Sequence, residues 1–281
     1  MESSQPSFFA RNDFLIRRLH SLSGLIPVGA YMVVHLIVNA SVINGDATFQ
    51  NQVLNIHKFG ALLPAIEWTF IFIPILFHAI IGFWIIAEGL PNPHQYPYGA
   101  NYRYTLQRAT GMIAFVFIML HVFHMHGWFH NDSWVNYVVN PFGGGQFKPY
   151  NATSTAGLAL QSTVIVAIYI IGVLACIFHL ANGIWTSGIT WGIWTSERAQ
   201  RRALRVCAAF GLLLTVISGA ALFGMRAAVN TPEKLDAVRQ REEMMIQTKT
   251  ATGDIEANEH KMYHPPESDE AAQANESKQE Q

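Results

Sequence analysis

Charged and thiol side chains are scarce in this chain of 281 residues. Asp, Glu, Lys and Arg make up 13% of it, and cysteine occurs twice, as Cys176 and Cys207. The net charge of −1 offers no basic surface, so we expect no nucleic-acid partner. Two separate cysteines give no disulfide framework and no C-x-x-C-H haem attachment, and they are too few to hold an iron–sulfur cluster.

The scarcity of charge leaves five long apolar stretches without any Asp, Glu, Lys or Arg. About 20 residues in a helix, at roughly 1.5 Å each, cross a hydrocarbon layer of about 30 Å. A buried core helix could explain one such stretch, but it is a poor explanation for five. We therefore predict an all-α integral membrane protein with five transmembrane helices. The predicted spans cover residues 23–43, 68–87, 109–129, 158–185 and 206–225.

Arginine is concentrated in the N-terminal segment and in the second and fourth connections between spans. These arginines are Arg11, Arg17, Arg18, Arg103, Arg108, Arg198, Arg201, Arg202 and Arg205. The opposite connections carry only Lys58 and Lys148. Because cytoplasmic loops are enriched in Lys and Arg, we expect a cytoplasmic N-terminus and, after five spans, a C-terminus outside.

The composition changes at Asn230, where polar residues begin to dominate. We therefore expect a membrane domain over residues 1–229 and a polar tail over residues 230–281. Residues 232–249 are predicted to form a short polar helix, with Pro232 in its first turn, where proline is tolerated. The rest of the tail has too little apolar content to pack and is expected to be disordered.

Four of the five spans contain a histidine near their middle, namely His35, His78, His121 and His179. A polar ring inside hydrocarbon is costly and indicates a functional site. Counted from the inner edges of their spans, His35 and His121 both lie about 18 Å deep. His78 lies about 14 Å deep, and His179 about 9 Å, or nearer 14 Å if its helix extends to Gly188. Depth thus predicts an inner pair, His78 with His179, and an outer pair, His35 with His121.

Each pair suits a six-coordinate iron with one imidazole on each face of a porphyrin, and without covalent attachment the haems would be of b type. Gly82 and Gly183, four residues after two of the histidines, leave room for a flat ring on the same helix face. Three alternatives remain open. His124 shares a face with His121 and could replace it as a ligand, the histidines could simply hydrogen-bond between helices, or they could bind zinc, which their lack of clustering disfavours. His20 lies too shallow by this depth estimate to be counted as a ligand.

Several strings stand out along residues 8–226. They are RRLHSLSG from Arg17, IPVG from Ile26, HLIVN from His35, HAIIGFWI from His78, LQRATG from Leu106, His121–Val122, and YIIGVLACIFHLANGIWTSGITWG from Tyr169. Together they resemble the cytochrome b subunit of succinate dehydrogenases, the five-helix di-haem type of Bacillus and related menaquinone users.

The resemblance implies that His78 and His179 are the axial ligands of an inner haem and that His35 and His121 are those of an outer haem. It also implies that the chain anchors a flavoprotein and an iron–sulfur subunit on the cytoplasmic face of a bacterial inner membrane. Electrons from succinate, which the partner subunits oxidise, would pass through two b haems to a quinone, expected to be menaquinone. The chain would thus belong to an enzyme, a succinate:quinone oxidoreductase.

Two positions qualify the resemblance. Related di-haem fumarate reductases carry a Glu implicated in proton transfer two residues before the last haem ligand, where this chain has Ile177. Glu67, at the outer end of the second span, resembles an acidic position of the Bacillus type, and either a quinone or proton role or a plain wetted carboxylate would explain it. Two other functions also remain open: a fumarate reductase anchor working in reverse, and a transporter or structural membrane protein without haem.

Overall fold

A computed structural model of the chain describes residues 8–89 and 94–264. These residues are helical or irregular and include no strand. Five helices among them are long and apolar enough to cross a membrane, which confirms the predicted class of fold. They cover Arg11–Asn44, Gly60–Glu88, Gly99–His126, Thr163–Thr190 and Glu197–Ala228.

Two of these helices are composite. The first consists of α1 (Phe8–Ser23), η1 (Gly24–Gly29) and α2 (Ala30–Ala40), and the second includes α4 (Leu63–Glu67), η4 (Trp68–Phe72) and α5 (Ile73–Glu88). Both η1 and η4 are wide π-helical turns. Each lies at or just before a proline, Pro27 and Pro74, whose missing N–H interrupts the α-helical hydrogen bonds.

The remaining spans are single helices. They are α6 (Gly99–His126), α9 (Thr163–Thr190) and α10 (Glu197–Ala228). The shorter elements are η2 (Ser41–Asn44), α3 (Asp46–His57), η3 (Gly60–Leu62), α7 (Asp132–Trp134), η5 (Val135–Val139), η6 (Pro149–Asn151), α8 (Ala152–Ala159), α11 (Pro232–Ala251) and η7 (Glu259–Lys261).

All five spanning helices differ from the predicted spans at their boundaries, and two of these differences have a clear structural cause. The third span ends at His126 rather than residue 129, because Gly127 adopts a left-handed conformation (φ 83°) that stops the helix. The fourth was predicted to start at residue 158, but residues 158 and 159 close α8 and the spanning helix starts at Thr163. Hydropathy alone does not detect such a break, because the residues around it are also uncharged.

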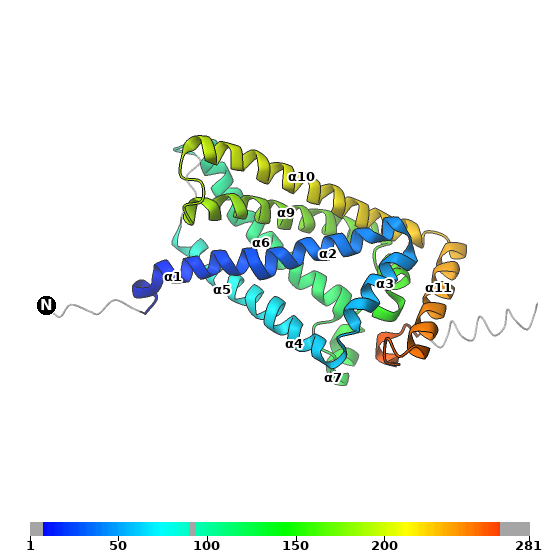
Figure 1. Cartoon of the computed structure of the whole chain (residues 1–281). Helices are drawn as coiled ribbons and strands as arrows, with labels where there is room; N and C mark the ends of the chain where they lie inside the picture. Colours follow the sequence, from blue (N-terminus) through cyan, green and yellow to red (C-terminus); the bar gives the residue numbers. More distant parts are fainter. Residues whose placement is uncertain (1–7, 90–93, 265–281) are drawn as a thin grey trace, which may run out of the picture.

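Helix α9 lies in the middle of the bundle, where it contacts α6 on one side and α10 on another (Figure 1). Leu36, Ile177, Leu180 and Leu214 form a buried cluster that joins α2, α9 and α10. Gly211 permits this close approach, since a Cβ there would lie 3.2 Å from the Cβ of Ala181. Apolar side chains also cover the outside of the spans, as a lipid environment requires; exposed examples include Ile80, Val164, Leu212 and Val216.

The bundle has two unlike ends (Figure 1). At one end lie the start of α1 and the connections from α5 to α6 and from α9 to α10, where the arginines are concentrated. We call this the arginine-rich end. Arg17 pairs there with Glu88, and Arg108 donates to the carbonyls of Gly89 (2.6 Å) and Ile85 (3.2 Å) at the end of α5.

The other end, which we call the α11 end, carries α3, α7 and α11. The carboxylate of Glu242 on α11 is 1% exposed and accepts bonds from the backbone N–H groups of Thr153 (2.8 Å) and Ser154 (2.9 Å). The Ser154 hydroxyl adds a third bond of 2.6 Å. First-turn N–H groups have no partner within their own helix, so Glu242 caps α8 from a different helix. Burial raises the pKa of this carboxyl group, although the three bonds oppose the shift.

The predicted polar helix over residues 232–249 corresponds to α11. The structure differs from the expected disorder over residues 250–264. There, Tyr150 donates to the carbonyl of Glu256 (2.6 Å), and Ile255 is buried against Tyr150, Leu54 and Ile246. The segment is polar on average, so its few apolar residues were not enough to predict these contacts. The rest of the predicted tail, residues 265–281, lies outside the described residues.

Candidate functional site

The four histidines of the predicted spans meet as two pairs inside the bundle. His78 on α5 faces His179 on α9, with ring centroids 6.0 Å apart and ring planes at 86°. His35 on α2 faces His121 on α6, with centroids 5.9 Å apart and planes at 74°. These are the same two pairs that the estimated depths predict. We keep the names inner pair and outer pair for them.

The ring spacing of both pairs suits one metal ion between two imidazoles. A ligating imidazole nitrogen lies about 2 Å from the metal and roughly 1 Å from the centre of its own ring, so rings on opposite sides of one ion have centroids roughly 6 Å apart. The observed values, 5.9 and 6.0 Å, match this distance. Two rings joined by a direct hydrogen bond, with no ion between them, would have their centroids closer together than the observed distances.

Backbone carbonyls hold the inner pair in one tautomer. The Nδ1 atom of His78 donates to the carbonyl of His20, and that of His179 donates to the carbonyl of Gln107, each at 3.0 Å. Each ring therefore keeps an unprotonated Nε2, which is the form that ligates a metal. Both carbonyls belong to a neighbouring span, so helix packing sets the orientation of the rings.

Two glycines on the facing helices make room for these rings. A Cβ on Gly24 would overlap the ring of His78, and one on Gly111 would lie 2.9 Å from the ring of His179. The glycines suggested by sequence have more space, since a Cβ on Gly82 or Gly183 would be 3.4 or 3.5 Å from its nearest neighbour. Gly24 and Gly111 were not predicted from the sequence, although each ends one of the strings that carry the resemblance.

Tyr169 on α9 organises the outer pair. Its hydroxyl lies 3.1 Å from Nδ1 of His121 and 2.8 Å from Nδ1 of His124, so it can donate to one ring and accept from the other. The ring that faces His35 is that of His121, while His124 lies beside Tyr169. On the other side, the Asn39 amide donates to the His35 carbonyl (2.7 Å) and lies 3.4 Å from His35 Nε2. Neither Tyr169 nor Asn39 was predicted from the sequence.

His20 also reaches the inner pair. Its ring stacks on that of His78, with centroids 4.0 Å apart and planes at 9°. The depth estimate placed His20 at the membrane edge, but α1 extends the first span inward to Arg11 and brings the ring alongside His78. Among the described residues, buried His20 Nδ1 and Arg103 Nε have no hydrogen-bond partner. Such groups are costly unless an acceptor reaches them.

Glu67 lies on the same side of the bundle as the outer pair. It ends α4, in the span that packs beside the one carrying Tyr31 and His35. The ring of Tyr31 stacks at 5.6 Å on that of His35. Ile177, in contrast, is 4% exposed within the apolar cluster of α2, α9 and α10, so that position carries no carboxylate into the bundle.

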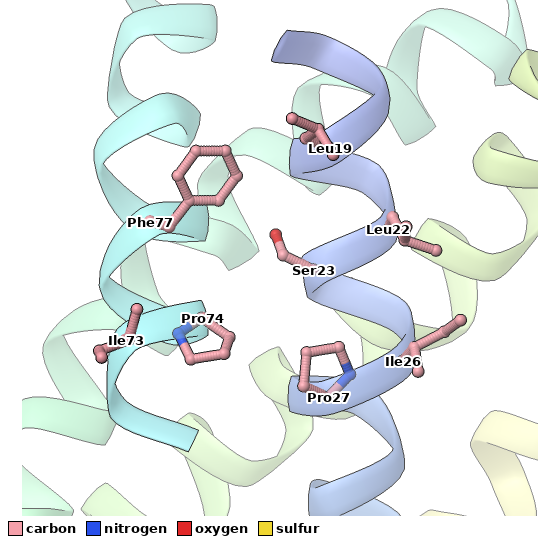
Figure 2. A pocket seen from close by; sticks show the side chains of 8 residues that line it. All are labelled: Leu19, Leu22, Ser23, Ile26, Pro27, Ile73, Pro74 and Phe77. Atoms are coloured by element: carbon pink, nitrogen blue, oxygen red, sulfur yellow. The ribbon is translucent and has the colours of Figure 1, made fainter. Parts of the chain in front are cut away.

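An apolar recess of about 440 Å³ opens between α1–η1 and α5. Figure 2 shows Pro27 and Pro74 across from each other, with Phe77 and Ser23 between the two helices. The lining includes Leu22, Ile26, Pro27, Ile73, Pro74 and Phe77.

A five-helix membrane bundle that holds two pairs of facing histidines defines a membrane protein of the cytochrome b class. None of the family models compared matches the chain. It is, however, 34% identical over 214 residues to the succinate dehydrogenase cytochrome b558 subunit of Bacillus subtilis (strain 168), and the match covers 75% of this chain and 96% of that protein. The chain therefore belongs to the succinate dehydrogenase cytochrome b family, as a membrane-anchor subunit of an oxidoreductase complex.

Proposed function

We propose that the chain binds two b haems, one between His78 and His179 and one between His35 and His121, and passes electrons from an iron–sulfur subunit to a membrane quinone. The observation that carries the proposal is the spacing of the two ring pairs, 6.0 and 5.9 Å. Each bound haem supplies a one-electron carrier, and two carriers at different depths provide a path across the bundle.

The residues around the inner pair fit a haem in three further ways. The two ligand rings present unprotonated Nε2 atoms. Gly24 and Gly111 leave space where any side chain would push a ring aside. His20 Nδ1, whose ring stacks on that of His78, is buried without a hydrogen-bond partner among the described residues and is a suitable donor for a propionate group of a haem.

Around the outer pair, this chain's residues orient the ligands and exclude water. Tyr169 fixes the ring of His121, and Phe117, 8% exposed, packs on both residues. Such supporting contacts set the basicity and orientation of the ligands, and the apolar surroundings tune the redox potential. His35 and His121 are therefore proposed as ligands, and His124 as a neighbour held by Tyr169.

We place the arginine-rich end in the cytoplasm of a bacterial cell and the α11 end outside. Support comes from the concentration of arginine at one end of the bundle, which the positive-inside rule assigns to the cytoplasm. The flavoprotein and iron–sulfur subunits would dock on this face, nearest the inner pair. Residues 1–229 would form the di-haem membrane domain, with residues 230–264 packed on its outer end.

The quinone, expected to be menaquinone, is proposed to react at the outer end of the electron path. The ring of Tyr31 stacks on that of His35 there, and Glu67 ends α4 in the span that packs beside theirs. Quinone reduction consumes protons, and a carboxylate within reach of the external water can relay them. Glu67 is therefore assigned a quinone or proton role.

Haem stoichiometry tests the proposal. Purified complex should contain about two b haems per copy of this chain, as a scheme of four ligands and two irons requires. Replacing His179 or His78 by Ala should remove one of them, whereas His130→Ala, which changes a histidine outside both pairs, should keep both. A wild-type value near one or zero would refute the assignment and leave a structural or transport role.

A further inference from the structure

His179 and Gln107 are joined twice, in opposite directions, where α9 packs on α6. The Nδ1 atom of His179 donates to the backbone carbonyl of Gln107 (3.0 Å), and the side-chain amide of Gln107 donates to the backbone carbonyl of His179 (3.1 Å). A shift of one helix against the other would therefore stretch both bonds together. The orientation of the His179 ring thus depends on the side chain of Gln107 as well as on its backbone.

Asn182, three residues after His179 on α9, holds the other end of the Gln107 amide. Its Nδ2 atom donates to Oε1 of Gln107 (2.8 Å), and its side chain is buried, with 7% of the residue exposed. The amide of Gln107 is thus bonded through both its nitrogen and its oxygen. Because buried polar groups are costly to leave without partners, this side chain has one strongly favoured position. We call the bonds among Gln107, His179 and Asn182 the Gln107 clamp.

Two glycines give the clamp its space. Gly111 follows Gln107 by four residues on the same face of α6, and a Cβ there would lie 2.9 Å from the ring of His179. Gly183 follows His179 by four residues on α9, and a Cβ there would lie 3.5 Å from Nε2 of Gln107. The ring of His179 can therefore reach the carbonyl of Gln107, and the amide of Gln107 can lie against α9.

The partner ligand of the inner pair is held differently. His78 donates to the carbonyl of His20, and the side chain of His20 stacks on the ring of His78 rather than returning a bond to its backbone. A firmly held acceptor at Nδ1 makes an imidazole a more basic ligand. A more basic ligand stabilises the ferric form of a haem iron and so lowers its reduction potential. The clamp applies this effect to one ligand of one pair.

We propose that Gln107 is a positioning residue for the inner haem. Held by Asn182, its side chain fixes the bond from His179 Nδ1 to the Gln107 carbonyl and keeps the reduction potential of this haem lower than it would be without the clamp. The proposal rests on the proposed function, because it assumes a haem between His78 and His179. It adds a side chain that touches the backbone of a ligand and acts through that ligand.

The experiment is a redox titration of the b haems in the purified, intact complex, together with EPR spectra of the ferric haems. The inner haem is identified as the one that His179→Ala removes. Gln107→Leu has a similar size but cannot form the hydrogen bonds of the clamp. It should keep both haems and raise the ratio of reduced to oxidised inner haem at a fixed potential about tenfold, which is about 59 mV for a one-electron carrier. The EPR signal of the inner haem should also change, whereas the potential and signal of the outer haem should not.

A second variant tests whether Asn182 acts through Gln107. Asn182→Leu should shift the potential of the inner haem in the same direction. The double variant should show no further shift beyond Gln107→Leu, because residues that act through one shared interaction are not additive. Should Gln107→Leu fail to assemble, Asn182→Leu decides alone, because it leaves Gln107 and both helix backbones unchanged.

Thr105→Val is the matched control. Thr105 lies two residues before Gln107, on nearly the opposite face of α6, and its hydroxyl bonds to Asn101 within the same helix (3.1 Å). This variant should behave as wild type. An unchanged inner potential, equal shifts of both haems, additive shifts in the double variant, loss of the inner haem in both single variants, or the same shift in Thr105→Val would overturn the proposal. Failure of the proposed function would appear differently, as wild-type complex without a haem that depends on His179.

Discussion

The docking of α11 depends on one buried carboxylate, which makes it a sensitive point for mutation. Glu242 accepts the N–H groups of Thr153 and Ser154 and the hydroxyl of Ser154. Glu242→Ala would leave two buried backbone donors without an acceptor, at about 1–3 kcal/mol each. A loss near 3 kcal/mol in the free energy of docking is expected, and at about 1.4 kcal/mol per factor of ten this increases the opening constant more than 100-fold.

Hydrogen exchange of the α11 amides, followed by mass spectrometry, measures this opening directly. An undocked polar helix of 20 residues is marginal in water, so its amides should exchange when it leaves α3 and α8. Glu243→Ala is the matched control, because it removes the same charge at the adjacent, exposed position. Unchanged protection of α11 in Glu242→Ala, or equal loss in Glu243→Ala, would show that the buried cap does not hold the helix.

The same site predicts a pH dependence. Burial raises the pKa of Glu242 above its usual value of 4.5, so the folded state binds this proton more tightly than the unfolded state. The stabilising contribution is therefore complete below pH 4.5 and is lost as the pH rises through the raised pKa. Glu242→Gln resembles the neutral acid and should remove this dependence, which exchange rates corrected for intrinsic pH effects would reveal. A pH profile of Glu242→Gln identical to that of wild type would contradict the assignment.

Two further predictions concern the electron path. Gly111→Val should displace the ring of His179 and remove the inner haem, which pyridine haemochrome analysis would show as about one haem per chain. Gly99→Val, at a glycine with open space around it, should keep two haems. Equal haem content in the two variants would refute the steric argument. Glu67→Gln should slow succinate-to-quinone turnover but keep both haems and succinate oxidation by an artificial acceptor. Unchanged quinone turnover would show that Glu67 is an ordinary interfacial carboxylate without a role in quinone reduction.

The spans and the depth of the histidines could be predicted from sequence because both depend on one helix at a time. A run of uncharged residues determines whether a helix enters a membrane, and a constant rise per residue converts position into depth. His35 and His121 lie equally far from the inner edges of their predicted spans, and the structure brings the centroids of their rings to 5.9 Å from each other.

The supporting residues could not be predicted in this way, because they depend on which helices are neighbours. Gly24 contacts His78, and Tyr169 contacts His121. Each contact joins two different helices, so the position of a residue along its own helix does not predict it. The order of the C-terminal segment was missed for another reason. Val238, Glu242 and Ile246 are buried along one narrow face of α11, and four-residue spacing of this kind is hidden by the polar average of the helix.

The cap on α8 also has a consequence for the order of biosynthesis. Ser154 and its acceptor Glu242 are separated by 88 residues. At a synthesis rate of about 5–20 residues per second, Glu242 is made roughly 5–20 seconds after α8. During this time α9 and α10 are synthesised and inserted. The α11 end thus reaches its final structure after the spans that carry the histidines. Variants that delay docking of α11 should therefore be most vulnerable to proteases in newly made protein, with the histidine pairs already in place.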